Sequence, residues 1–121
     1  MRGLVRDDQG AATRQNLPIP NLSRDETLVR VGMVGICDTD LHLIRGYMGF
    51  RGILGHEFLG LAPDGRRVTA EINHSCHACS TCLRGQPNHC PHRTVLGILR
   101  HDGAMADYVR PGVVMGSQAE M

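Results

Sequence analysis

The chain has 121 residues, a net charge of +1 and 41% hydrophobic residues. This length predicts one domain, and this composition predicts a folded chain rather than a disordered one. The balanced charge and the very few aromatic residues argue against a nucleic-acid-binding surface, and no apolar run approaches the length of a membrane span.

Short strands are predicted along the chain, because apolar stretches alternate with turn-forming Gly, Pro, Asp and Asn. The expected strands cover residues 1–6, 11–17, 26–36, 58–61, 67–72, 94–99 and 104–109. Many short strands separated by turns are typical of a small barrel or sandwich. The predicted fold is therefore mainly β.

One short helix is predicted after the third strand. Asp38 or Thr39 is a suitable first cap, and Gly46 is suited to end a helix that runs through Arg45. Further glycines at positions 49, 52 and 55 then mark a loop. The last residues, 111–121, show no periodicity and are predicted to be a frayed tail or a connection to something longer.

Five cysteines stand at positions 37, 76, 79, 82 and 90. Their odd number, and an N-terminus without the apolar stretch of a signal peptide, predict a cytoplasmic protein rather than a disulfide framework. The spacing Cys76-x2-Cys79-x2-Cys82-x7-Cys90 predicts a structural zinc site, because four thiolates close a tetrahedral shell and leave no open position. The two-residue gaps let neighbouring thiolates converge on one ion, and the longer gap lets the chain return.

An iron–sulfur cluster is the alternative occupant of this four-cysteine segment. Cys90 precedes Pro91 and the first two gaps fit the bacterial ferredoxin pattern, but the third gap is seven residues instead of three. Basic side chains nearby are expected to offset the negative charge of the site as solvated or hydrogen-bonded groups rather than as ligands. They are His74, His77, Arg84 and His89.

Cys37 and the pair His56-Glu57 stand apart from this segment. Alone, a single cysteine is typical of packing and a single histidine of a hydrogen-bonded residue. The order of the motifs along the chain is a second signal. The first motif is Cys37-Asp38-Thr39-Asp40-Leu41-His42 and the second is Gly55-His56-Glu57. The four cysteines follow, and then a strand-like stretch at 102–109. Together these motifs resemble the zinc-dependent medium-chain alcohol dehydrogenases, and the resemblance covers residues 1–110.

The resemblance implies a fold and a domain organisation. Residues 1–110 would form a GroES-like catalytic domain, a partly open barrel of short strands, with the zinc-binding lobe at 74–92 and a tail or truncated connection at 111–121. It also implies zinc-dependent oxidation of an alcohol or polyol to an aldehyde or ketone. Two zinc ions are expected. In the intact enzyme, NAD or NADP would be the hydride acceptor, and the resemblance is compatible with a homo-oligomer. The partner would be a small-molecule alcohol, with no nucleic acid and no membrane.

Three residues carry the implied catalytic zinc. Cys37 and His56 match two of its ligands. Glu57 matches a glutamate behind the metal, which ligates the ion itself in the polyol dehydrogenase branch. Zinc with an open position acts as a Lewis acid and acidifies a bound alcohol.

Three residues of the predicted helix carry implied roles around that metal. Asp40 matches the carboxylate that orients the ligating histidine, as metal-bound imidazoles generally require. Thr39 matches the hydroxyl that hydrogen-bonds the substrate alcohol, and His42 the outer end of a proton relay. Read without the resemblance, Asp40 and Thr39 are helix caps, and His42 is a solvated side chain.

The sequence also departs from the family pattern. No G-x-G-x-x-G fingerprint follows a strand, so the nucleotide-binding Rossmann domain is absent from these residues. The chain alone is therefore expected to be an inactive, truncated or excised piece. Asp38 stands where the family commonly has glycine or a basic residue, and the short connection at 60–65 predicts an open barrel edge.

A second hypothesis belongs to another functional class. The chain would be a non-catalytic, zinc-stabilised β-domain that serves as a structural or binding module. It would hold zinc only in the four-cysteine lobe, and Cys37 and His56 would have no role.

Overall fold

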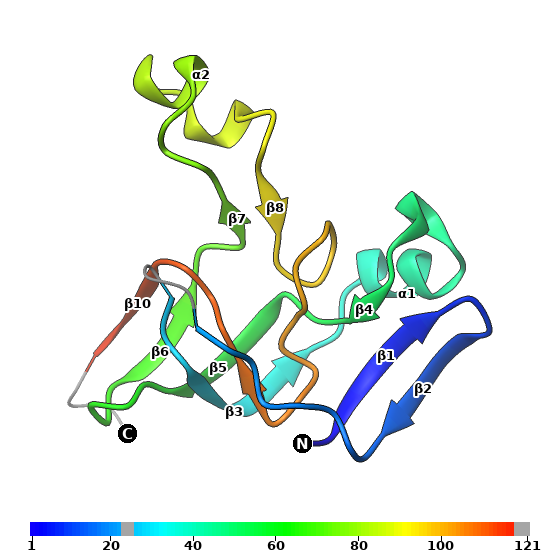
Figure 1. Ribbon diagram of the computed structural model, residues 1–121. Coiled ribbons are helices and arrows are strands. Elements are labelled where there is room, and N and C mark those ends of the chain that lie inside the picture. The colour runs from blue at the N-terminus through cyan, green and yellow to red at the C-terminus, as the bar shows by residue number, and fades with distance from the viewer. Residues whose placement is uncertain (23–25, 118–121) are drawn as a thin grey trace.

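The computed structural model describes residues 1–22 and 26–117. Within these ranges the chain forms short β-strands, two short α-helices and two 3-10 turns, so the predicted mainly β class is confirmed (Figure 1). The longer helix has seven residues, and no helix in the described ranges has the length and apolar content needed to cross a bilayer.

The elements have the following bounds. The strands are β1 Gly3–Asp7, β2 Gly10–Arg14, β3 Val29–Gly35, β4 Gly52–Ile53, β5 Glu57–Leu61, β6 Arg67–Ala70, β7 Asn73–His74, β8 Thr94–Val95, β9 Tyr108–Val109 and β10 Val114–Ser117. The helices are α1 Asp38–Ile44 and α2 Ser80–Leu83, and the 3-10 turns are η1 Tyr47–Gly49 and η2 Pro87–His89.

The strands form three antiparallel sheets. One has the order β2-β1-β4, the largest has the order β10-β6-β5-β3-β9, and the smallest pairs β7 with β8. The β7–β8 pair is the narrow base of a lobe that projects away from the other two sheets and carries α2 at its tip (Figure 1). Only two residue pairs, Asn73–Val95 and His74–Thr94, make up this base.

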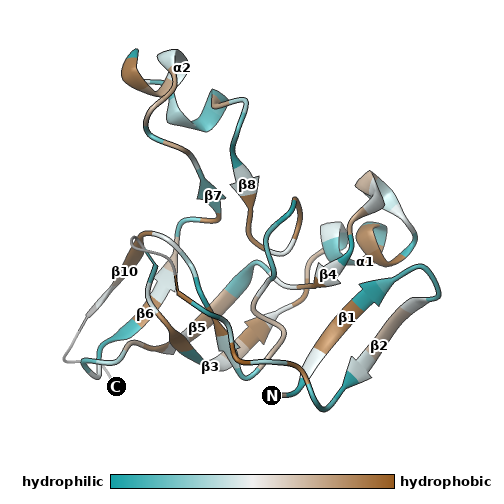
Figure 2. Cartoon of the chain, viewed as in Figure 1, coloured by the Kyte–Doolittle hydropathy of each residue, from teal (hydrophilic) through white to brown (hydrophobic). Residues whose placement is uncertain are grey.

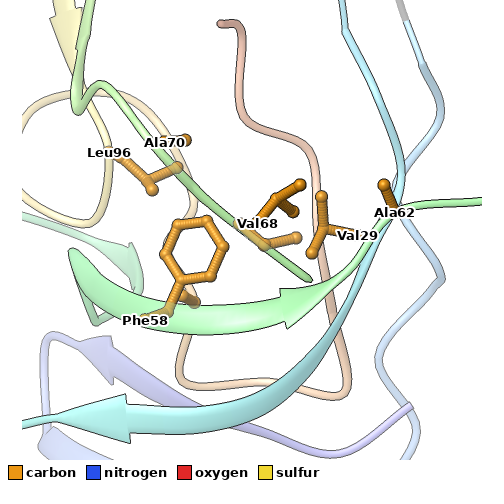
Figure 3. Packing of buried hydrophobic residues seen from close by; sticks show 8 residues of the cluster. Val29, Phe58, Ala62, Val68, Ala70 and Leu96 are labelled. Carbon is orange, nitrogen blue, oxygen red and sulfur yellow. The ribbon is translucent and has the colours of Figure 1, made fainter. Parts of the chain in front are cut away.

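Two hydrophobic clusters hold the body together. The larger lies against the five-stranded sheet and includes Val29, Val68 and Leu96, each 0–1% exposed (Figure 3). Each such fully buried side chain contributes about 1.5–3 kcal/mol. The smaller cluster, Leu43, Phe50 and Leu54, fixes α1 to the body. Figure 2 shows apolar segments in β1, β3 and β5, the strands that face these clusters.

Helix α1 forms where it is predicted, but its cap is Cys37 instead of Asp38 or Thr39, and the single predicted helix is joined by a second one, α2. The Asp40 carboxylate accepts a hydrogen bond from the Cys37 backbone N–H at 3.0 Å, which satisfies one donor at the helix start. Leu43 is fully buried and anchors the helix from the other side. Gly46, with a φ of +104°, donates its N–H to the Leu43 carbonyl and turns the chain away.

The two predicted strands at 94–99 and 104–109 are wrong in extent. Gly97 and Arg100 both have positive φ, so the chain turns after β8 instead of remaining extended. Residues 103–105 then donate backbone hydrogen bonds to the irregular segment 53–55, and regular pairing begins again only at β9. The alternation of apolar residues there reflects burial against the core rather than strand geometry.

Two predictions are wrong for the same reason: the frayed tail at 111–121 and the open barrel edge beside the connection at 60–65. Residues 114–117 form β10, which pairs antiparallel with β6. The β5–β6 hairpin is short, with pairs only at Gly60–Val68 and Leu61–Arg67. Strand β10 covers the edge of β6 that the short connection is predicted to leave open.

Gly55, which directly precedes the predicted ligand His56, has no room for a side chain. Its φ is +107°, and a Cβ at this position would lie 2.7 Å from both the Met105 backbone N and Met105 Cγ. We expect Gly55→Ala to lower the free energy of unfolding by about 2–4 kcal/mol, from backbone strain plus overpacking. Denaturant unfolding measures this. Gly10→Ala is the matched control, because Gly10 also has positive φ but open space around its Cβ position; equal effects of the two changes would contradict the packing argument.

Candidate metal centres

The lobe above β7 and β8 gathers four cysteines from consecutive turns. Cys79 caps α2, with its sulfur accepting from the Cys82 backbone N–H, so the first turn of this helix brings two thiols to one side. Turn η2 then returns the chain, and the Cys90 N–H donates to the Pro87 carbonyl. The residue spacing therefore becomes a spatial cluster through two tight turns.

The sulfur atoms have the geometry of a tetrahedral site. Cys76 and Cys82 sulfurs lie 4.0 Å apart, Cys79 and Cys90 sulfurs 3.7 Å, and Cys76 and Cys90 sulfurs 3.5 Å. All four lie within 4.8 Å of one another. Zinc–sulfur bonds of about 2.3 Å in a tetrahedron place the sulfurs about 3.8 Å apart, so the arrangement fits one zinc ion with a closed shell.

Backbone N–H groups stabilise negative charge on the sulfurs of Cys76, Cys79 and Cys90, whereas desolvation raises the pKa of the Cys82 thiol. The N–H groups of Ala78 and Cys79 donate to Cys76 Sγ at 3.4 and 3.3 Å, and they hold the pKa of the Cys76 thiol down to about 6. The His92 N–H likewise donates to Cys90 Sγ at 3.4 Å. Because metal ligation needs thiolates, these donors prepare the lobe for a cation. Within the described ranges this group consists of the four cysteines.

A second group joins residues from α1 and from the start of β5. Cys37 Sγ lies 3.2 Å from His56 Nε2, and His56 Nδ1 lies 3.4 Å from Asp40 Oδ1. The other Asp40 oxygen, Oδ2, accepts from the Cys37 N–H. Asp40 is only 1% exposed, so its carboxylate is held between the helix start and the imidazole.

This second group also fits a metal ion. A zinc–sulfur bond of about 2.3 Å and a zinc–nitrogen bond of about 2.0 Å place the two ligand atoms about 3.5 Å apart in a tetrahedron. The His56 ring directs Nε2 to the cysteine and Nδ1 to a carboxylate, which is the usual arrangement of a metal-ligating histidine. Asp40 Oδ1 and His56 Nδ1, 3.4 Å apart, are buried and have no hydrogen-bond partner within the described residues.

Other predicted site residues lie outside this group. Glu57 is exposed, opposite Gly35 in the β3–β5 pairing, and is not part of the cluster. Thr39 is half-buried on α1, and His42 is exposed one turn later with its ring 6.4 Å from that of Tyr47. The roles that the resemblance gives to Glu57, Thr39 and His42 stay predictions.

A third group escapes the sequence analysis. Glu26, His74 and His101 each offer one ligand-type atom within 4.8 Å of the others. The sequence assigns no role to Glu26 or His101 and treats His74 only as a neighbour of the cysteines. These residues are far apart along the chain and share no motif, so only the fold brings them together.

Replacing Asp40 by asparagine tests the orienting role of its carboxylate. Asn can still accept from the Cys37 N–H, so we expect the variant to fold, while metal affinity at the Cys37–His56 group falls about 10–100-fold. Titration with Co²⁺, followed through the thiolate-to-cobalt absorption of Cys37, measures this affinity. Asp38→Asn, which changes an exposed acid on the same helix, is the control and should have no effect; an unchanged affinity in Asp40→Asn would contradict the role.

Comparison with known proteins gives consistent matches. Residues 23–112 match the family described as the alcohol dehydrogenase GroES-like domain. Sorbitol dehydrogenase from Bacillus subtilis (strain 168) is 35% identical over 112 residues, covering 79% of this chain and 32% of that protein. The structure of galactitol-1-phosphate dehydrogenase from Escherichia coli has a TM-score of 0.83 and 28% identity, covering 100% of this chain and 39% of that chain.

A further solved structure contains a nucleotide. The short chain alcohol dehydrogenase rspB from Escherichia coli CFT073, complexed with cofactor NADH, has a TM-score of 0.81 and 27% identity, covering 99% of this chain and 39% of that chain. The chain spans about a third of the length of the curated relatives it matches.

Proposed function

Because the chain belongs to the alcohol dehydrogenase GroES-like domain family, we propose that it is the zinc-binding catalytic part of an oxidoreductase. The intact enzyme would oxidise an alcohol or polyol to a ketone or aldehyde. Residues 1–110 would form the catalytic domain, with the structural zinc in the lobe at 74–92. Strand β10, which pairs with β6, would extend this domain beyond residue 110.

The Cys37–His56–Asp40 group is the observation that carries this proposal. Cys37 and Asp40 come from the start of α1 and His56 from the segment before β5, and the contacts join them in the order sulfur, imidazole, carboxylate. A purely structural zinc module has no need of this second group. A zinc ion held there, with an open position, supplies Lewis-acid polarisation of an alcohol oxygen.

The protein's own side chains would then manage the proton of the alcohol. Thr39 and His42 lie three positions apart on α1, so their side chains are neighbours on one helix face. Thr39 is half-buried and His42 is exposed, so the pair leads from the site toward solvent. Thr39 would accept the hydrogen bond of the substrate hydroxyl, and His42 would pass the proton to water.

Glu57 would act from the opposite side of His56. It directly follows that histidine and is exposed on β5. In this position it would serve as an additional ligand when the metal is bound, as the polyol dehydrogenase resemblance implies.

NAD or NADP would supply the hydride acceptor. The 121 residues contain no G-x-G-x-x-G segment, so the nucleotide would be held by a part of the enzyme outside them. All five cysteines are free thiols. A reducing compartment, the cytoplasm, would keep them available for metal.

A Co²⁺ experiment on the chain itself tests the proposal without requiring hydride transfer. We expect Cys37→Ala to lose one metal ion relative to the wild type, while the four-cysteine lobe keeps its own. We also expect imidazole, a neutral ligand for an open coordination position, to shift the visible bands of the cobalt at Cys37 and His56. The bands of the lobe should not move, because its shell is closed.

Two outcomes would overturn the catalytic proposal. One is equal metal content in the wild type and Cys37→Ala. The other is a cobalt spectrum that imidazole leaves unchanged in the wild type. Either result would favour the non-catalytic zinc-stabilised module. Ser80→Ala, a change on the exposed side of α2, is the control for general effects of substitution.

A further inference from the structure

A third group of ligand-type side chains lies at the foot of the projecting lobe. Glu26 comes from the segment before β3, His74 from β7, and His101 from the loop before β9. One oxygen or nitrogen of each lies within 4.8 Å of the others. All three line a cavity of about 320 Å³, which gives the group access to solvent.

Arg110 organises two members of this group. Its Nη1 donates to both Glu26 carboxylate oxygens, at 3.0 and 2.9 Å, and fixes the carboxylate, whose side chain is 3% exposed. Its backbone carbonyl accepts from His101 Nε2 at 3.0 Å. A carbonyl only accepts, so Nε2 carries the proton, and the Nδ1 lone pair faces the Thr94 hydroxyl, whose oxygen lies 3.3 Å away and would give way to a metal ion.

His101 and His74 each offer a ring nitrogen to this group. The two imidazole rings lie 5.5 Å apart. His74 Nδ1 is buried and has no hydrogen-bond partner within the described ranges, an arrangement that costs free energy unless something else satisfies the ring.

We propose that Glu26, His74 and His101 bind a divalent transition-metal ion of the zinc class, separate from the two sites of the proposed function. Two imidazoles and one carboxylate are a donor set that such ions prefer. A ligating carboxylate is normally hydrogen-bonded by a further group, and a ligating imidazole normally donates its other N–H to a carbonyl or carboxylate. Arg110 provides both of these supports, and water from the cavity completes the coordination shell.

This ion would add a bond between the lobe base and the body. His74 belongs to the two-residue base of the lobe, whereas Glu26 and His101 belong to the body. A shared ion would therefore reinforce a connection that the contacts of His101 with Thr94 and His74 already make.

Metal analysis of the dialysed, Zn²⁺-reconstituted chain tests the proposal. We expect His74→Ala to contain one ion fewer than the wild type. We expect the same difference between the double variant Cys37→Ala/His74→Ala and Cys37→Ala alone, in which the ion of the proposed catalytic site is already gone. When both proteins are loaded with Co²⁺, the spectrum of His74→Ala should have weaker visible bands than that of the wild type. Its thiolate-to-cobalt absorption should be unchanged, because this site has no sulfur ligand. His92→Ala is the matched control, since His92 lines the same cavity outside the group.

Equal metal content in wild type and His74→Ala would overturn the proposal. So would an equal loss in His92→Ala, which would place the ion elsewhere in the cavity. If circular dichroism shows that His74→Ala does not fold, Glu26→Gln decides, because it keeps the shape of the side chain and one of the two oxygens that accept from Arg110. Glu26→Gln with wild-type metal content would overturn the proposal, and the loss of one ion would support it.

Discussion

Removing zinc from the four-cysteine lobe, by a chelator or by Cys90→Ser, is expected to take away most of the folding free energy of the lobe and to destabilise the whole chain. From residue 76 to residue 89 no side chain is buried, and Leu83 is 75% exposed. The lobe therefore has no apolar core to replace the metal. A structural zinc site contributes on the order of 10 kcal/mol, comparable with the 5–15 kcal/mol of a typical domain.

Circular dichroism, thermal melting and limited proteolysis measure this effect. We expect chelation to lower the melting temperature and to open the segment between Cys76 and Cys90 to cleavage first. Thr81→Ala, a change within α2 that leaves all four sulfurs in place, is the control. An unchanged melt and an uncut lobe after chelation would contradict a structural zinc. A brown protein with absorption in the blue would instead indicate an iron–sulfur cluster.

Replacing His56 by alanine is expected to lower alcohol oxidation by about a thousandfold or more. The Lewis acid that His56 would hold is worth several kcal/mol of transition-state stabilisation, and each 1.36 kcal/mol is a factor of ten in rate. The effect on stability should be smaller, because the ring, although only 10% exposed, precedes β5 and is not a member of either hydrophobic cluster.

The assay combines this chain with a separately produced nucleotide-binding domain, NAD(P)⁺ and a panel of alcohols and polyols. His77→Ala, which removes an exposed histidine of the lobe, should retain full activity and is the control. Activity in His56→Ala above about a tenth of that of the control would contradict the proposed role. The metal content of each variant, measured in parallel, separates loss of the ion from loss of the fold.

The four-cysteine lobe could be predicted from spacing alone because its ligands lie within fifteen residues of one another. Helix α1 could also be predicted in place and length, since Gly46 after it is a local signal, but its cap is Cys37 and not the predicted Asp38 or Thr39. The family resemblance is confirmed by the match over residues 23–112. Cys37 and His56 are different: the spacing between them carries no signal, and only the resemblance pointed to their contact.

Features that depend on long-range packing could not be predicted. Strand β10 forms because β6 offers it an edge, and nothing in its own sequence marks it. The apolar residues after Val95 suggested a longer strand, but positive φ at Gly97 and Arg100 turns the chain there. The Glu26–His74–His101 group depends on three separate elements meeting at the lobe base, which no local pattern encodes.

The Asp40 carboxylate couples the position of helix α1 to the orientation of the His56 ring. One oxygen is tied to the backbone at the start of α1 and the other faces the imidazole of His56, so the helix and the ring cannot move independently. The helix in turn is clamped through Leu43 to Phe50 and Leu54. Changing the packing of this small cluster would therefore shift the Cys37–His56 pair indirectly. Substitutions within the cluster are a way to adjust metal affinity while every ligand stays unchanged.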